Sequence, residues 1–214
     1  MFSRKLLLAA LVVAALLACT PVLAQDLSSD DDNPMGEFTF TPKIGYALLG
    51  PQTSFLGYGG IPSYGAVVFN SLNAQAEFMF GGKGSAFQVA PFYMMLRADK
   101  PNSDSWNAVG VYLGYLYSWH FPTERSGVFY PGIGAGWGGG YVFGGAFNYG
   151  TVNVLRIPGS LTWYPSQKTR VALVMELSVG MQTTTMWFNN TFGTLETVSS
   201  YGLYVDAMVG VRFF

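Results

Sequence analysis

Residues 107–121 read NAVGVYLGYLYSWHF, and this stretch decides the expected fold. Its apolar residues recur at every second position, which places them on one side of an extended chain. That side consists of Val109, Val111, Leu113, Tyr115, Tyr117, Trp119 and Phe121. It becomes aromatic toward one end, as expected where hydrocarbon meets lipid headgroups. The pattern therefore predicts a strand with one side facing a membrane.

Related alternations recur along the chain, separated by residues typical of turns. They predict eight strands, at 37–49, 64–80, 86–97, 106–121, 128–143, 151–164, 169–183 and 200–214. Tight turns alternate with mostly longer connections, at 50–63, 98–105, 144–150 and 184–199. Bacterial outer-membrane barrels have short periplasmic turns, longer outside loops and an even number of strands. The sequence therefore predicts an all-β fold, an eight-stranded antiparallel up-and-down transmembrane β-barrel with both termini in the periplasm.

Four of the predicted strands place apolar side chains outward and polar ones inward, the inverse of a soluble protein. In the seventh, Leu173, Met175 and Leu177 alternate with Glu176 and Ser178. The first, second and eighth strands have the same pattern. The third and sixth alternate less cleanly, and a shift of one residue would exchange their two faces.

The first 24 residues are expected to be a signal peptide. Arg4 and Lys5 precede a short apolar run, and Val22-Leu23-Ala24 forms a small-residue cleavage site. Leu16-Leu17-Ala18-Cys19 also resembles a lipoprotein processing box, so lipidation of Cys19 is the alternative to cleavage after Ala24. Residues 25–36 are rich in aspartate and are expected to form an acidic flexible periplasmic tail. Calcium binding by this tail is not expected, because the regular spacing of a calcium loop is missing.

The composition is unusual for a soluble domain. Charged residues make up 11% of the chain, against ~25% in average globular proteins. No stretch after the leader is long enough for a membrane helix, which needs ~20 apolar residues. A closed barrel is the other structure that satisfies every backbone group in lipid. Losing Arg4 and Lys5 with the leader leaves nine basic against 12 acidic residues, so nucleic acid is not an expected partner.

The last strand alternates up to Phe213, and the chain ends in a second aromatic residue, Phe214. A terminal aromatic residue on such a strand resembles the signal read by the outer-membrane insertion machinery, although Phe214 falls in the inward register of Asp206 and Arg212. Residues 37–214 as a whole resemble the small outer-membrane β-barrel family typified by the OmpA transmembrane domain and the opacity-type porins. The resemblance implies a fold and a cell outer-membrane location, while members differ widely in function.

Charged residues at inward positions form the main candidate site. They are Lys43, Glu77, Arg156, Arg170, Glu176, Asp206 and Arg212. The interior of an eight-stranded barrel is just wide enough for its own side chains. Unpaired charges there would be costly, so we expect pairing across the lumen, with Arg170 and Arg212 beside Glu176 and Asp206. The charges would form either a structural plug or a narrow ion-selective path.

Ser118 and the single histidine, His120, lie two positions apart on the inward side of one predicted strand. A hydroxyl and an imidazole on one face are the start of a nucleophile–base pair. Lipid A deacylases are small barrels with such a pair, but their motif resembles His-x-Ser and their site opens to the bilayer. Here the order is Ser-x-His and the residues point inward, which favours ordinary polar lumen residues.

Gly134, Gly136 and Gly139 match the spacing G-x-G-x-x-G. A dinucleotide site is not expected, because no amphipathic helix and no acidic residue ~20 positions on follow. Instead, every second residue from Gly132 to Gly140 is glycine. Facing inward, these glycines would leave room for large lumen side chains such as Tyr112.

The sequence thus favours a non-enzymatic outer-membrane protein with a structural or surface-interaction role, acting through loops 50–63 and 184–199. The alternatives are a small channel or transporter and a lipid acyl hydrolase. We expect no catalytic residues, no cofactor and no metal. The expected partners are outer-membrane lipids, the insertion machinery through the C-terminal strand, and an unidentified surface ligand, with the protein itself a monomer.

Overall fold

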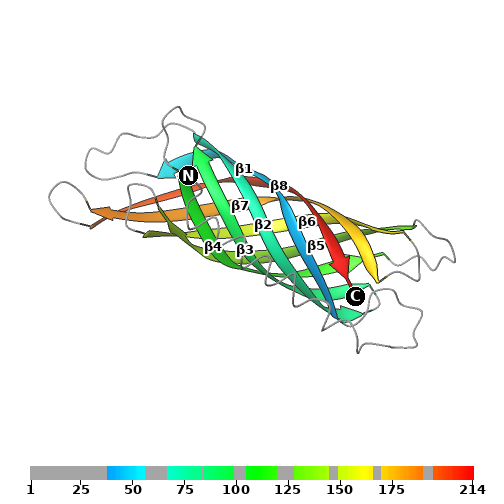
Figure 1. The fold of residues 1–214 in the computed structure, drawn as a ribbon. Coiled ribbons are helices and arrows are strands. Elements are labelled where there is room, and N and C mark those ends of the chain that lie inside the picture. The colour runs from blue at the N-terminus through cyan, green and yellow to red at the C-terminus, as the bar shows by residue number, and fades with distance from the viewer. Residues whose placement is uncertain are drawn as a thin grey trace, which may run out of the picture.

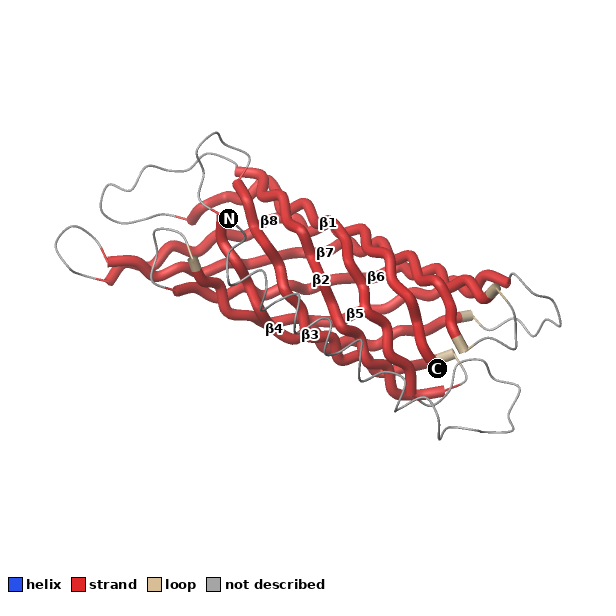
Figure 2. The backbone as a smooth tube through the Cα atoms, in the orientation of Figure 1, coloured by secondary structure: helices blue, strands red, loops and turns tan. Residues whose placement is uncertain are grey.

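The computed structural model describes residues 38–55, 67–82, 84–98, 105–119, 128–144, 149–165, 170–189 and 195–214. These residues form eight antiparallel strands, each paired with the next, and the last pairs with the first to close a barrel (Figures 1 and 2). The strands are β1 (Phe38–Phe55), β2 (Val67–Gly82), β3 (Ser85–Ala98), β4 (Ser105–Ser118), β5 (Val128–Phe143), β6 (Tyr149–Tyr164), β7 (Val171–Asn189) and β8 (Leu195–Phe213). The predicted fold class is confirmed, whereas the predicted leader, Cys19 and the acidic tail lie outside the described residues.

The strand register fixes the width of the barrel. Moving from partner to partner through all eight strands, a path that starts at Thr39 returns to β1 at Leu49, a stagger of ten residues. A stagger of this size tilts the strands by about 40° from the barrel axis. Eight strands at this tilt enclose a space that side chains fill. The interior is therefore a packed core.

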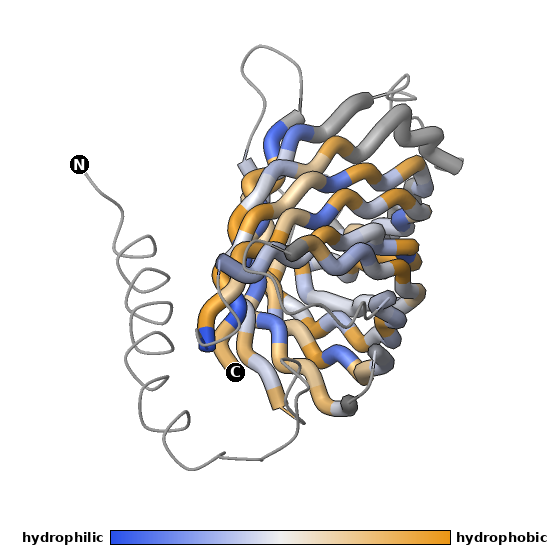
Figure 3. Tube along the Cα trace, turned by 90° about the vertical axis from the view of Figure 1, so that its right-hand side faces the viewer, coloured by the Kyte–Doolittle hydropathy of each residue, from blue (hydrophilic) through white to orange (hydrophobic). Residues whose placement is uncertain are grey.

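Every strand carries exposed apolar side chains on its outer side. Figure 3 shows the hydropathy alternating along the strands. On β7 the exposed apolar residues run from Val171 to Met181. These ten residue steps cover about 34 Å of strand and about 26 Å along the axis. That height matches the ~25 Å apolar band of outer-membrane barrels. Among the described residues, no helix is long and apolar enough to cross a membrane.

The predicted facing holds in the strands with clean alternation. The outward residues of β4 from Val109 to Tyr117 are all exposed, as is Trp119 directly after the strand. Tyr112 and Leu116 are buried inside. Phe40 keeps its outward register but is buried, because its ring packs on those of Phe78 and Phe213. His120 and Phe121 lie outside the described residues.

The structure also shows which residues face inward on β3 and β6, the two strands whose alternation left their facing open. β3 turns Phe92, Met94 and Leu96 into the barrel, and β6 turns Val152 and Val154 inward. These strands alternated poorly because apolar residues occupy both of their faces. At the end of the chain Phe214 stays in the inward register, where its ring packs 5.3 Å from that of Tyr164.

Three strands extend further than the sequence predicts. The predicted loop 184–199 is wrong for 184–189 and 195–199, which continue β7 and β8 as a paired hairpin. Likewise, residues 50–55 of the predicted loop 50–63 belong to β1. The sequence prediction ended each strand where its apolar side ends. Backbone pairing continues beyond that point, and β-branched Thr183 and Thr185 favour an extended chain.

A charge on the outward side should test this placement. In lipid vesicles we expect Val209→Arg, near the middle of the apolar band, to lower the free energy of unfolding by ~2–4 kcal/mol. Ser199→Arg on the same strand lies beyond the band and should cost ~0–1 kcal/mol. Urea titration of both variants measures the difference, and equal costs at the two positions would contradict the placement of the band.

Candidate functional site: a buried charge network

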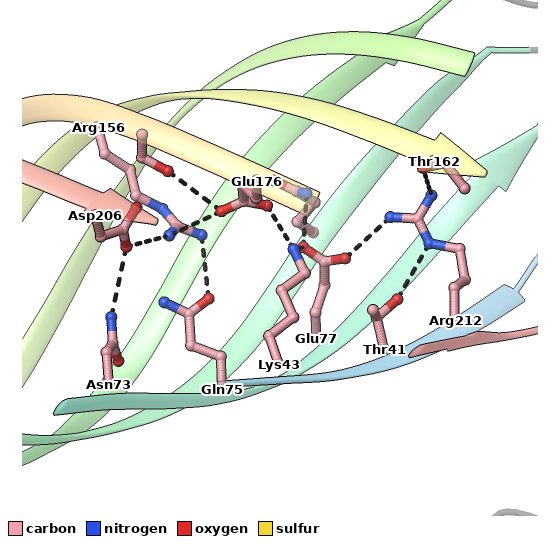
Figure 4. A network of polar contacts seen from close by, with 12 residues as sticks. Thr41, Lys43, Asn73, Gln75, Glu77, Arg156, Thr162, Glu176, Asp206 and Arg212 are labelled. Carbon is pink, nitrogen blue, oxygen red and sulfur yellow. Dashed lines mark hydrogen bonds and ion pairs between the residues drawn. The ribbon is translucent and has the colours of Figure 1, made fainter. Parts of the chain in front are cut away.

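Lys43 on β1 is the centre of the buried charge network. Its Nζ lies 2.5 Å from Glu77 Oε2 on β2 and 2.5 Å from Glu176 Oε2 on β7. All three side chains are at most 1% exposed. Two further donors hold the carboxylates, since Gln88 Nε2 donates to Glu77 at 2.9 Å and Ser178 Oγ donates to Glu176 at 3.2 Å. One ammonium group therefore joins strands on both sides of the lumen (Figure 4).

Arg156 on β6 continues the network toward the end of the barrel opposite the C-terminus. Its Nη1 lies 3.2 Å from Glu176 Oε1 and 3.4 Å from Asp206 Oδ2, and its Nη2 donates to Gln75 Oε1 at 3.3 Å. The guanidinium carbon lies 3.8 Å from the centroid of the Tyr112 ring. This arrangement adds a cation–π contact to two ion pairs.

Asp206 on β8 is held mainly by neutral partners. Tyr204 Oη donates to its Oδ2 at 2.5 Å, and Asn73 Nδ2 donates to the same oxygen at 3.5 Å. Its Oδ1 has no hydrogen-bond partner among the described residues. The hydrogen-bonding capacity of the carboxylate at this end of the network is thus less fully used than that of the carboxylates around Lys43.

Arg212 on β8 forms the other end of the network. Its Nη2 lies 3.3 Å from Glu77 Oε1. Its Nε donates to Thr41 Oγ1 at 3.1 Å and its Nη1 donates to Thr162 Oγ1 at 3.3 Å. The expected partner of Arg212, Glu176 or Asp206, is wrong, because the ion pair is with Glu77, which extends from β2 on the other side of β1.

The network balances its charges. It contains three cations (Lys43, Arg156 and Arg212) and three carboxylates (Glu77, Glu176 and Asp206), and every side chain is buried. A buried charge without a partner is strongly destabilising, whereas a paired and hydrogen-bonded one is tolerated. The arrangement therefore offsets much of the desolvation cost of a charged interior.

Arg170 is the one predicted member that the structure places elsewhere. It is exposed and lies in a bend before β7 begins at Val171. Its carbonyl oxygen accepts a hydrogen bond from the Phe214 backbone N–H at 3.2 Å. The prediction that Arg170 faces the lumen is wrong, because alternation assigns faces only inside a paired strand.

Apolar layers lie on both sides of the network. Along the inward side of β3, Ala86 comes first, Gln88 of the network next, and then Ala90, Phe92 and Met94. The larger layer lies toward the end opposite the C-terminus, and it consists of Ala47, Ala90, Phe92, Met94, Leu96, Ala108, Tyr112, Val142, Val152, Val154 and Tyr204. Toward the C-terminal end, Tyr130, Tyr164 and Ala172 pack together with Phe214. The charges are thus enclosed between apolar side chains.

The glycines of β4 and β5 make room for Tyr112, as the sequence predicts. A Cβ added to Gly114 would lie 2.8 Å from Tyr112 Cε1, and one on Gly138 would lie 3.2 Å from Tyr112 Cδ2. Gly110 and Gly140 likewise leave space for the Phe92 ring, since a Cβ added to either would lie 2.6 or 2.9 Å from Phe92 Cζ. Small residues on one wall thus allow two large rings to fill the lumen.

The structure gives no support to a catalytic pair at Ser118. Its side chain is buried inside the barrel, and a Cβ added to Gly132 would lie 2.8 Å from Ser118 Oγ and 2.6 Å from Ser160 Oγ. His120 lies outside the described residues. Within the described strands, no group of three His, Cys, Asp or Glu side chains converges as metal ligands.

The fold and the filled interior define a small closed β-barrel, and solved structures include the same fold. The chain is similar to the outer membrane protein OprG from Pseudomonas aeruginosa, with a TM-score of 0.55 and 11% identity over 82% of this chain and 94% of that one. It is also similar to Neisserial surface protein A, with a TM-score of 0.44 and 15% identity over 83% and 97% of the two chains. No protein-family model and no curated protein matches the sequence. The fold expected from the resemblance to small outer-membrane barrels is thus confirmed.

Removing the central cation tests the charge network. Lys43→Met leaves two buried carboxylates without their shared partner and should lower the free energy of unfolding by ~3–5 kcal/mol. Arg170→Ala removes an exposed cation from the same barrel and should change it by less than ~0.5 kcal/mol. Urea denaturation of the two variants measures both values. Similar small losses would show that the interior charges are hydrated.

A size exchange tests the packing of Tyr112. Gly114→Val should be destabilising by ~1–3 kcal/mol, because the added methyl groups meet the tyrosine ring. The same change in a Tyr112→Ala background should cost less. The double-mutant cycle isolates this coupling, and additive effects would place the ring away from Gly114.

Proposed function

We propose that this protein is an integral protein of the bacterial outer membrane with a closed interior and a non-enzymatic structural or surface-interaction role. The observation that carries the proposal is the charge-balanced network around Lys43, enclosed between apolar layers. An interior filled by its own paired side chains supports a structural role for the barrel.

The outer surface supports the membrane location. The apolar band on β7 is about 26 Å high, close to what an outer-membrane barrel presents to lipid. Exposed apolar side chains of this number would favour association in water. The fold shared with OprG, an outer membrane protein, is consistent with this location. With both termini in the periplasm, the β7–β8 hairpin projects from the outer face of the membrane.

The burial of the charges favours a plug over a channel. A conducting path needs water along the lumen, but Glu77, Arg156 and Arg212 are at most 1% exposed. Large side chains also occupy the space on both sides of the network. The channel or transporter is therefore the second candidate, and it would require these layers to move.

We place the proposed surface interaction at the end of the barrel opposite the C-terminus. The β7–β8 hairpin continues beyond Met181, the last exposed apolar residue of β7 in the band. Figure 1 shows the orange and red strands projecting at this end of the barrel. Its outward residues include Thr183, Thr185 and Ser199, which are uncharged hydrogen-bonding side chains. A surface ligand would meet this hairpin and the predicted loop between β1 and β2.

Insertion into the membrane would use the C-terminal strand, β8. A monomer suffices, because the closed barrel has no free strand edge.

Conductance distinguishes the plug from the channel. Purified protein in a planar bilayer should show little steady conductance, and Lys43→Met should produce intermittent leaks as the network loosens. If the wild type instead conducts steadily, and Arg212→Ala shifts its selectivity toward cations at little cost in stability, the channel replaces the plug as the proposed function.

Cell fractionation tests the location. The protein should resist extraction with salt and should migrate faster on gels unless it is boiled, because a closed barrel stays folded in detergent. Recovery as a soluble periplasmic monomer would contradict the membrane assignment. The N-terminal mass of the mature protein then separates cleavage after Ala24 from lipidation of Cys19.

A further inference from the structure

A cluster of hydrogen-bond donors lies on the outer face of β2–β4, just beyond the apolar band. On β3, Met95 is the last exposed apolar residue, and Arg97 is the next residue on the same face. Arg97 is exposed. Two residues advance about 5 Å along the axis of a barrel with this tilt. In the membrane location proposed above, Arg97 therefore lies at the height where headgroups of the outer leaflet begin.

Three polar side chains surround Arg97 on this face. Asn70 on β2 and Ser105 on β4 are its direct cross-strand partners. Asn107 is the partner of Met95, one diagonal step from Arg97. Direct partners have Cβ atoms ~5 Å apart and diagonal ones ~7–8 Å apart. A long guanidinium side chain reaches over all three positions, so the four side chains can contact one small ligand.

Two tyrosines orient the amide groups of this cluster. Tyr46 Oη donates to Asn70 Oδ1 at 2.6 Å, and Tyr93 Oη donates to Asn107 Oδ1 at 2.5 Å. Each amide therefore directs its acceptor oxygen toward a tyrosine at the edge of the apolar band. The two amide nitrogens remain as donors. The cluster thus offers N–H and O–H groups to a ligand.

Among the side chains that the structure describes, the charge of the outer face has the sign that an anion needs. The carboxylates whose side chains the structure describes, Glu77, Glu176 and Asp206, all lie inside the barrel. Of the described residues, Arg97 is the cation at this edge of the band, and Arg170 lies at the opposite edge. Residues 99–104, between β3 and β4, lie outside the described residues.

We infer that Arg97, Asn70, Ser105 and Asn107 bind the phosphate group of an outer-leaflet lipid. A guanidinium donates two parallel hydrogen bonds to phosphate, and amide and hydroxyl donors satisfy further oxygens. The acyl chains of the same lipid would lie along the apolar band directly below, beside Met95 and Leu72. This site rests on the proposed outer-membrane location and gives the expected lipid partner a defined contact.

Native mass spectrometry of the folded barrel in detergent tests the site. The probes are phosphorylated lipid A and the same lipid A with its phosphates removed. Wild type should retain the phosphorylated form roughly tenfold better, as expected for loss of a charge-assisted contact. Arg97→Gln should reduce retention to that of the dephosphorylated form. Arg170→Gln, which removes the exposed cation at the opposite edge, should retain lipid like wild type.

Other outcomes would overturn the inference. Equal retention of the two lipids by wild type would exclude a phosphate site. An equal loss in Arg97→Gln and Arg170→Gln would indicate general attraction between charges. Displacement of the lipid by inorganic phosphate alone would indicate a site for a soluble anion. Each variant is first shown to be folded by its heat-dependent migration, and failure of the wild type to insert into vesicles would count against the membrane location and not against the site.

Discussion

The limited width of an eight-stranded barrel is the constraint on which the rest of the structure depends. Its stagger of ten residues leaves space for side chains and little for water. Six charged residues nevertheless point inward, and each must find a partner of opposite sign within reach. Lys43 meets this requirement by sharing its ammonium group between Glu77 and Glu176. Because these residues come from β1, β2 and β7, the ion pairs also join strands that are distant in sequence.

The same constraint explains the distribution of side-chain sizes in the interior. Tyr112 on β4 and Phe92 on β3 are large, and they fit because the neighbouring inward positions on β4 and β5 are glycines. A ring beside a glycine on the same or the next strand keeps the local volume nearly constant. The Arg156 guanidinium then packs on the face of Tyr112 while it pairs with Glu176 and Asp206. Packing and electrostatics are therefore satisfied by the same side chains.

Alternation predicts the strands, the outward face and most of the charged interior, because a period of two fixes which side a residue occupies. It fails where pairing stops or where both faces are alike. Arg170 lies before β7 and is exposed, so its place in the two-residue alternation does not indicate which way its side chain faces. The strand ends beyond the apolar band are not predicted, because Thr and Ser replace the apolar residues that mark the rest of these strands. The partners of Arg212 could not be predicted, since alternation says nothing of which inward residues meet across the lumen.

The central claim is that the interior is closed to water, and thiol accessibility tests it most directly. Cys19 is the single cysteine of the chain, so a variant without it can carry one new thiol. Ser178→Cys places that thiol at a fully buried position beside Glu176, and Ser199→Cys places it at an exposed one. A water-soluble maleimide should label Ser199→Cys at once and Ser178→Cys only after unfolding. Rapid labelling of folded Ser178→Cys would contradict the closed interior.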